Sequence, residues 1–165
     1  MDSSQAATQH LTFFLGDEEY AIALLRLRQI LDYRPPTRVP TVPSCIRGVI
    51  NLRGMVVPVI DLALKFGDGE SAPTRTTCIV IVELSIDGTP TLMGVIADRV
   101  HQVVELGEGD IDPPPPFGTR VRVDFLVGLG KVADRFVLLL DVDKVLSQHE
   151  LYAANEIVAT MEAAE

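Results

Sequence analysis

The apolar residues of this chain gather in runs that are short, rich in β-branched side chains, and bounded by Gly, Pro or Asp. The clearest runs are residues 56–60, 78–84, 92–97 and 136–140. Runs of this length and composition predict β-strands. Asp87-Gly88 lies between two of them and is typical of a two-residue hairpin turn, in which both central residues need positive φ. We therefore expect a mainly β protein whose neighbouring strands are antiparallel.

Two segments have helical patterns. Apolar residues recur at helical spacing over residues 24–31 and stop before Pro35-Pro36, which predicts one short amphipathic helix after the first strands. Near the end of the chain, Ser147 and Glu150 match a capping box, so a final helix is expected to start there. The predicted organisation is a flexible tail over residues 1–10, one domain over 11–147, and a C-terminal helix or tail over 148–165.

Composition limits the classes of function. The chain has 165 residues, 14 Lys and Arg against 23 Asp and Glu, and a net charge of −9. This charge repels nucleic-acid phosphates and anionic lipid headgroups, so we expect no nucleic-acid binding. The apolar runs fall far short of the roughly 20 residues that span a bilayer, and the first residues lack an export signal. We expect a cytoplasmic protein with no direct membrane insertion.

One pattern occurs twice. Residues 57–66 and 137–146 each consist of an apolar run, an aspartate and a short segment of helical character, with the aspartates at Asp61 and Asp141. An aspartate at such a junction can cap a helix by accepting hydrogen bonds from its exposed N–H groups. The echo indicates two similar β units, or else it is a coincidence, because strand, aspartate and helix often follow one another.

No motif for a cofactor or a metal ion is convincing. The histidines are too scattered to form a zinc site, and Cys45 and Cys78 lack CxxC spacing. The glycine series at residues 128–133 fits a relaxed dinucleotide fingerprint, but it leads into a strand instead of a helix, so a hairpin turn is the better interpretation. The acidic, proline-rich segment 105–117 is expected to be a loop or crossover. We expect no catalytic residues, cofactor or metal.

Several motifs together resemble the CheW family of bacterial chemotaxis coupling proteins, and the similarity covers roughly residues 11–146. The longest of these motifs is the segment 46–62, which contains Asn51-Leu52-Arg53-Gly54. Shorter motifs occur in the same order at residues 15–20, 94–98, 111–117 and 126–130. The resemblance implies two five-stranded barrels of SH3-like topology packed together on a shared core. It also implies a non-catalytic adaptor that binds the cytoplasmic tips of chemoreceptors and the regulatory domain of the histidine kinase CheA.

The resemblance also implies candidate site residues. Arg53 is similar to a signature arginine implicated in receptor coupling, and Leu27, Val100 and Val103 match apolar positions of the receptor groove. Gln29 stands where the family often has an acidic residue, so an ionic contact there becomes a neutral hydrogen bond. Gly48 matches a glycine implicated in kinase contact. Other than Gln29, these positions also have an ordinary structural explanation: a solvated turn charge for Arg53, core packing for the apolar residues, and a tight turn for Gly48.

Two alternatives remain open. One is a small-molecule-binding or enzymatic β-domain that uses the acidic loop and His101. The other is a CheW-like protein that builds receptor arrays, including those of non-flagellar chemosensory systems, without controlling a kinase.

Overall fold

The computed structural model describes residues 8–40, 42–67, 69, 72–114 and 123–163. Its strands and α-helices are β1 (Thr8–Leu15), β2 (Glu18–Ala23), β3 (Leu27–Asp32), β4 (Ile46–Leu52), β5 (Met55–Ile60), α1 (Leu62–Lys65), β6 (Cys78–Ile86), β7 (Thr89–Ala97), β8 (Arg99–Leu106), β9 (Ile111–Asp112), β10 (Leu126–Val132), β11 (Arg135–Leu140) and α2 (Gln148–Ala163). In these residues no helix is both long and apolar enough to span a bilayer.

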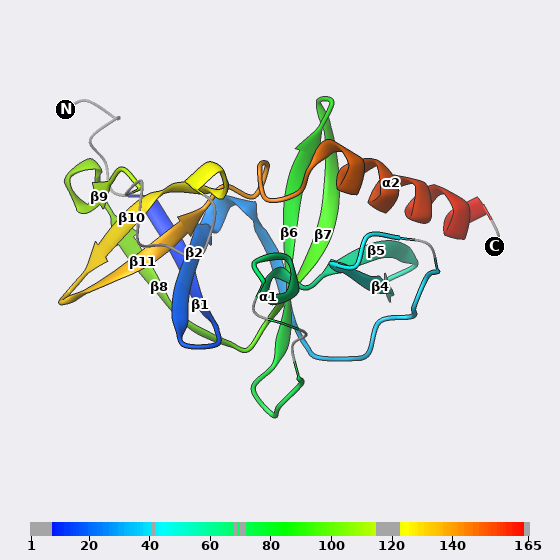
Figure 1. Cartoon of the computed structure of the whole chain (residues 1–165), viewed down its shortest axis with the longest axis horizontal. Coiled ribbons are helices and arrows are strands. Elements are labelled where there is room, and N and C mark those ends of the chain that lie inside the picture. The colour runs from blue at the N-terminus through cyan, green and yellow to red at the C-terminus, as the bar shows by residue number, and fades with distance from the viewer. Residues whose placement is uncertain (1–7, 41, 68, 70–71, 115–122, 164–165) are drawn as a thin grey trace.

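The strands form two sheets that lie side by side (Figure 1). Sheet A has six strands in the order β8-β1-β2-β11-β10-β9, and sheet B has five in the order β3-β6-β7-β5-β4. The sixth strand of sheet A, β9, has only two residues. The expected mainly β fold of two SH3-like barrels is confirmed.

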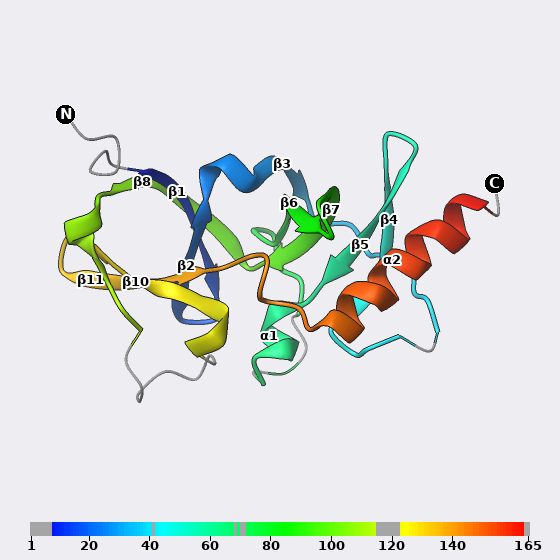
Figure 2. The ribbon, with the colours of Figure 1, turned by 90° about the horizontal axis from the view of Figure 1, so that it is seen from above.

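Each sheet takes one edge strand from the other half of the chain. β3 follows β2 of sheet A in the sequence but pairs with β6 of sheet B, whereas β8 follows β7 of sheet B but pairs with β1 of sheet A. Figure 2 shows the chain passing between the two halves at these points. Because each exchanged strand is held by the other sheet's ladder, the barrels cannot separate without breaking backbone hydrogen bonds.

The two sheets share one topology. The order β8-β1-β2-β11-β10 repeats as β3-β6-β7-β5-β4. Each sheet has one parallel pair, β11 with β2 and β5 with β7. The register shifts at the same place in both hairpins, between Leu126 and Gly128 in β10 and between Ile46 and Gly48 in β4. These matches support the interpretation of two similar β units.

Both aspartates of the repeated pattern accept a hydrogen bond from a backbone N–H that follows them in the chain. Only Asp61 does so at the start of a helix. Asp61 accepts a hydrogen bond from Leu64 N at 3.2 Å and caps α1. Asp141 accepts from Asp143 N at 3.1 Å, and the residues that follow it form turns in place of the expected short helix.

The largest buried cluster is shared by both sheets. It joins side chains of β1 and β2, such as Phe13 and Tyr20, to β6 and β7 residues such as Val80 and Val95. Ala154 and Ile157 of α2 belong to the same cluster, so the C-terminal helix is part of the core. Each barrel has in addition a small interior cluster of its own.

The helix predicted over residues 24–31 is wrong beyond its first turn. Only Leu24–Arg26 forms a turn of 3-10 helix, and β3 begins at Leu27. Side chains of β3 alternate between half-buried and exposed, with Leu27, Gln29 and Leu31 facing inward. Leucines four residues apart lie on one face of a strand as well as of a helix. Pairing with β6 decides between the two, because it satisfies the backbone and places Leu27 against the core.

Other local predictions are confirmed. Asp87 and Gly88 have φ of 51° and 79°, as the hairpin turn requires. Ser147 N donates to Glu150 Oε1 at 2.8 Å and Glu150 N to Ser147 Oγ at 3.1 Å, which completes the capping box. The predicted N-terminal tail over residues 1–10 is too long, because β1 begins at Thr8.

The two predicted loops are partly strands. Gly128 and Gly130 of the glycine series lie within β10, and Ala133 forms the turn that follows them. The acidic segment contains the end of β8, a 3-10 turn over Glu108–Asp110, and β9. Residues 115–117 of that segment lie outside the described residues.

Candidate partner-binding surface

Arg53 stands at the tip of the hairpin between β4 and β5. Arg53 and Gly54 have φ of 53° and 87°, and Leu52 pairs with Met55, which defines a two-residue turn with both residues left-handed. The Asn51 Oδ1 accepts a hydrogen bond from Gly54 N at 2.8 Å and stabilises this turn. Asn and Gly are the residues that this turn normally prefers, so an exposed arginine there is held at a conformational cost.

The tip of this hairpin lies beside the end of β3. Arg34, two residues after β3, donates from Nη2 to the carbonyl oxygen of Asn51 at 2.7 Å. Leu31 and Leu52 pack against the same interior cluster of sheet B. These contacts close the barrel and bring Arg53 to the β3 side of the molecule.

Leu27 and Val100 lie on the two exchanged strands and pack against the same shared core. Both are half-buried, Leu27 at the start of β3 and Val100 in β8. Packing against the core is enough to explain why both residues are apolar. The part of each side chain that stays exposed can be reached by a partner.

Gln29 and Val103 lie further along the same two strands. Val103 is 48% exposed, so packing does not explain an apolar residue there. Gln29 is half-buried in β3 and pairs with Ile81 across the strands. The structure thus brings Leu27 and Val100 to one shared core and places Gln29 and Val103 further along the same two edge strands, with Arg53 on the hairpin beside β3.

Gly48 lies in a strand, so the expected tight turn is wrong. Its φ is +145°, in the irregular part of the β4–β5 ladder, and an ideal Cβ would overlap the carbonyl oxygen of Thr37. Thr37 N donates to Val49 O at 2.8 Å and Val49 N to Thr37 O at 2.9 Å. The glycine is required because these hydrogen bonds hold the segment before β4 directly over its backbone.

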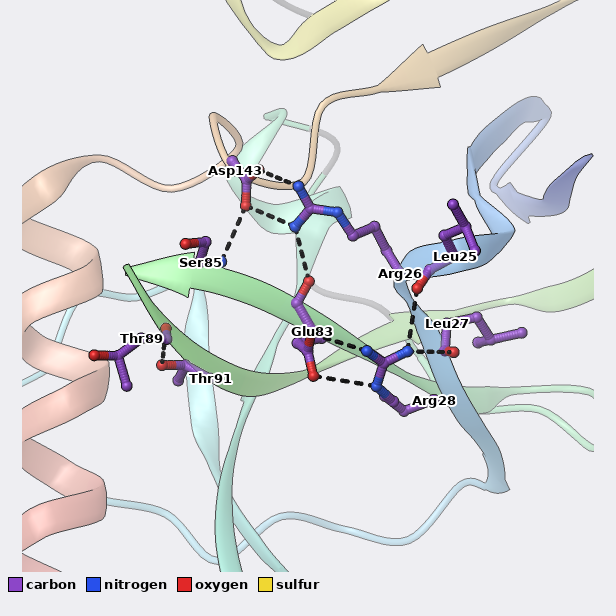
Figure 3. Close-up of polar contacts among 9 residues, drawn as sticks. All are labelled: Leu25, Arg26, Leu27, Arg28, Glu83, Ser85, Thr89, Thr91 and Asp143. Carbon is purple, nitrogen blue, oxygen red and sulfur yellow. Dashed lines mark hydrogen bonds and ion pairs between the residues drawn. The ribbon is translucent and has the colours of Figure 1, made fainter. Parts of the chain in front are cut away.

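Two arginines that the sequence analysis did not single out hold the turn that leads into β3 (Figure 3). Arg26 donates from Nη1 and Nη2 to the two carboxylate oxygens of Asp143 at 3.0 and 2.5 Å, and also to the carbonyl oxygen of Glu83 at 3.1 Å. Arg28 Nη2 lies 2.8 Å from Glu83 Oε2. The only sequence signal was that both arginines flank Leu27.

This arrangement favours the ionised form of the Asp143 carboxylate. Burial opposes its ionisation, but hydrogen bonds from Arg26 and from Ser85 N lower the pKa of Asp143 below its ordinary value. The same bond raises the pKa of Arg26. This bidentate pair ties the start of β3 to the segment that leads into α2.

Glu19 joins three strands of sheet A. Its side chain is 4% exposed, and Oε1 accepts from Arg135 Nε at 2.7 Å while Oε2 lies 2.8 Å from His101 Nδ1. Burial opposes its ionisation, yet the hydrogen bonds from Arg135 and His101 lower the pKa of Glu19 to about 2. His101 follows Val100, so Glu19 fixes the part of β8 that carries two candidate contacts.

The residues of the alternative hypothesis have structural partners. His101 is bonded to Glu19 and its ring contacts Phe14. In the acidic segment, Asp110 accepts from Gly107 N at 2.9 Å and Asp112 lies 3.4 Å from Lys131 Nζ. Among the described residues, no group of three or more His, Cys, Asp or Glu side chains is placed to hold a metal ion.

The fold joins two barrels through exchanged strands, and the candidate contacts lie on edge strands and at a hairpin tip. These features are those of a protein-binding module. Comparison with known proteins gives the family: the model of the CheW-like domain matches residues 9–150. The chemotaxis protein CheW of Klebsiella aerogenes is 33% identical over 90% of this chain and 87% of its own length. Protein FrzA of Myxococcus xanthus is 31% identical over 81% of this chain and 82% of its own.

Solved structures agree. The crystal structure of the scaffolding protein TtCheW from Thermoanaerobacter tengcongensis superposes with a TM-score of 0.78 at 30% identity, over 87% of this chain and 90% of that one. The chain belongs to the CheW family. Members of this family are non-catalytic chemotaxis scaffolds that couple receptors to CheA. This family assignment replaces the hypothesis of an enzymatic or small-molecule-binding domain.

Proposed function

We propose that this chain joins the cytoplasmic tips of chemoreceptors to the regulatory domain of a CheA-type histidine kinase. It works in the cytoplasm and is recruited to membrane-associated receptor arrays. The single observation that supports this best is the reciprocal exchange of β3 and β8 between the two sheets. A partner bound along these strands contacts both barrels at once.

The exchange suits a coupling protein for a physical reason. An adaptor transmits a signal only if its contacts with one partner differ between the states of the other. A receptor that shifts β3 or β8 acts on one sheet through that strand's own ladder, and on the other sheet through the chain that connects the strand to it. Arg26 with Asp143 and Glu19 with His101 attach the two strands to neighbouring segments, which would move with such a shift.

We assign receptor contact to Leu27, Gln29, Val100 and Val103, with Arg53 coupling to the receptor from the adjacent hairpin tip. Kinase contact is assigned to the surface around Gly48. Since glycine has no side chain, its role at that surface is to let Thr37 lie against β4, and the exposed side chain of Thr37 is the group that a partner meets.

Calorimetric titrations with the kinase regulatory domain and with a receptor tip fragment of the same organism test this assignment. Thr37→Asp is the kinase-face variant, because the Thr37 side chain is exposed, whereas any side chain on residue 48 would clash with the Thr37 backbone. Val103→Ser and Arg53→Ala are the receptor-face variants, and Thr89→Asp, on an exposed hairpin end, is the control.

We expect Thr37→Asp to weaken kinase binding alone and the receptor-face variants to weaken receptor binding alone. If every variant affects the same partner, the two assigned faces are wrong. If no CheA-type kinase of that organism binds, the coupling function is wrong. An array scaffold without kinase control predicts that receptor-dependent kinase activity is unchanged when this protein is omitted, whereas coupling predicts its loss.

A further inference from the structure

Arg26 ties the turn between β2 and β3 to two other segments. Its guanidinium donates to both carboxylate oxygens of Asp143, in the chain between β11 and α2, and to the carbonyl oxygen of Glu83 in β6. Asp143 is itself held by β6, because its Oδ1 accepts from Ser85 N at 3.2 Å. A two-point contact between a guanidinium and a carboxylate fixes the orientation of both groups. The turn, β6 and the chain before α2 are therefore joined through one ion pair.

Arg28 holds the same turn from its other end. Its Nη1 donates to the carbonyl oxygens of Leu25 and Leu27 at 3.1 and 3.3 Å, and its Nε donates to Glu83 Oε1 at 3.2 Å. Leu27 N donates to Leu24 O, and both of these leucines pack against the shared core. The backbone of Leu25 is consequently fixed by its neighbours on both sides.

The side chain of Leu25 takes no part in this packing. It is 83% exposed, more than any other large apolar side chain among the described residues. Figure 3 shows it pointing away from β6. A single exposed leucine is ordinary on a protein surface, but one on a loose loop binds at the cost of ordering that loop. Here the backbone is ordered before a partner arrives, so Leu25 can be buried against a partner at a lower entropic cost.

Leu25 belongs to the end of β3 that carries the candidate receptor contacts. It precedes Leu27 by two residues, and Leu27 packs with Val100 of β8 in the shared core. Thr37, on the candidate kinase surface, follows the opposite end of β3 and is bonded to Val49 of β4. The six residues of β3 separate these ends by roughly 20 Å. A partner that contacts Leu27 is within reach of Leu25, so the receptor surface is the one that includes it.

We propose that Leu25 is a further receptor contact and that Arg26, held by Asp143, is the residue that positions it. This inference rests on the proposed coupling function. A leucine side chain binds by burying apolar area, so the matching feature of the receptor is an apolar recess. Asp143 affects receptor binding through Arg26 and does not itself touch the receptor.

Calorimetric titrations of the full chain with a receptor tip fragment and with the kinase regulatory domain of the same organism test this proposal. We expect Leu25→Ser to weaken receptor binding about tenfold. Kinase binding should be unchanged, since the side chain is exposed and its loss does not disturb the core. Val127→Ser is the matched control, because it changes another apolar residue, 56% exposed, on β10 of the other sheet. It should leave receptor binding unchanged.

Asp143→Asn tests the positioning role without changing the arginine. It removes the ion pair, so the turn populates other conformations, and we expect receptor affinity to fall about threefold with the fraction of chains that remain competent. A loss of folding stability would weaken the binding of both partners, so unchanged kinase binding separates positioning from destabilisation. In the Leu25→Ser background, Asp143→Asn should cost less receptor affinity than in the unchanged chain, because it acts through that residue.

Receptor binding that Leu25→Ser weakens no more than Val127→Ser does would overturn the contact. A loss of kinase binding alone would also overturn it and would assign Leu25 to the kinase surface. If the two losses simply multiply in the double variant, Arg26 and Asp143 do not position Leu25. Receptor binding that is weakened by Val103→Ser and not by Leu25→Ser rejects the Leu25 contact alone. If the receptor fragment does not bind the unchanged chain, the coupling function and the contact are both wrong.

Discussion

The carbonyl oxygen of Thr37 occupies the space that any side chain on residue 48 would need. Gly48→Ala should therefore lower the free energy of unfolding by about 3 kcal/mol, because the clash is with backbone held by two hydrogen bonds and the φ of +145° is strained for alanine. Urea denaturation measures the loss.

Gly54→Ala is the matched control for this clash. Gly54 also has a positive φ, +87°, but a Cβ there meets nothing within 4 Å, so only the conformational cost of about 1 kcal/mol applies. Equal losses in the two variants would show that the Thr37 contact is not what requires Gly48. A kinase-binding defect of a Gly48 variant is consequently meaningful only after its stability has been measured.

Arg53→Asn should stabilise the protein and weaken its coupling to receptors. Asparagine tolerates the left-handed φ of 53° better than arginine, so we expect a gain of about 0.5 kcal/mol and a higher melting temperature. Receptor binding should weaken, since the guanidinium is lost. A variant that is both more stable and fully able to bind the receptor would leave Arg53 with only the role of an exposed turn residue.

Glu19 should make stability depend on acid pH. Its pKa of about 2 in the folded protein lies below the ordinary 4.5, so its contribution is fully present above pH 4.5 and is lost as pH falls towards 2. The size of the shift corresponds to roughly 3 kcal/mol. We expect Glu19→Gln to be less stable than the unchanged protein at pH 7 by roughly this amount and nearly equal to it at pH 2.

Urea unfolding of both proteins at pH 7, 4 and 2 provides the comparison. Other carboxylates with lowered pKa, such as Asp143, affect the two proteins alike, so only the difference between them reports on Glu19. A difference that stays constant over this range would contradict the assignment.

Cys45 should report whether α2 is docked. Its Sγ donates to Glu150 Oε2 of the helix at 3.3 Å, and burial together with the Glu150 charge raises the pKa of Cys45 to about 12. At pH 8 the thiol should react with a thiol reagent orders of magnitude more slowly than in the unfolded chain. Ile157→Asp, which loosens α2, should accelerate the reaction of Cys45 but not that of Cys78, which is buried in β6 between β3 and β7. Equal acceleration at both cysteines would indicate global unfolding.

Short-range features were predictable because a few neighbouring residues determine them. The strand over Met55–Ile60, the turn at Asp87-Gly88 and the capping box of Ser147 and Glu150 depend on side-chain size, on positive φ and on adjacent hydrogen bonds. The family resemblance added the two-barrel fold and the candidate contacts, because the motif around Arg53 is long and distinctive.

The sequence by itself determined the strands over residues 56–60, 78–84, 92–97 and 136–140, the turn at Asp87-Gly88 and the start of the C-terminal helix, since those choices rest on local periodicity and turn chemistry. Tertiary structure alone decided the rest. Residues 27–32 became a strand because β6 supplied backbone partners for a segment whose pattern fits either structure. Gly48, Glu19 and Arg26 acquired their roles from Thr37, Arg135 and Asp143, which are distant in the chain and are brought near only when the two sheets exchange and close their edges.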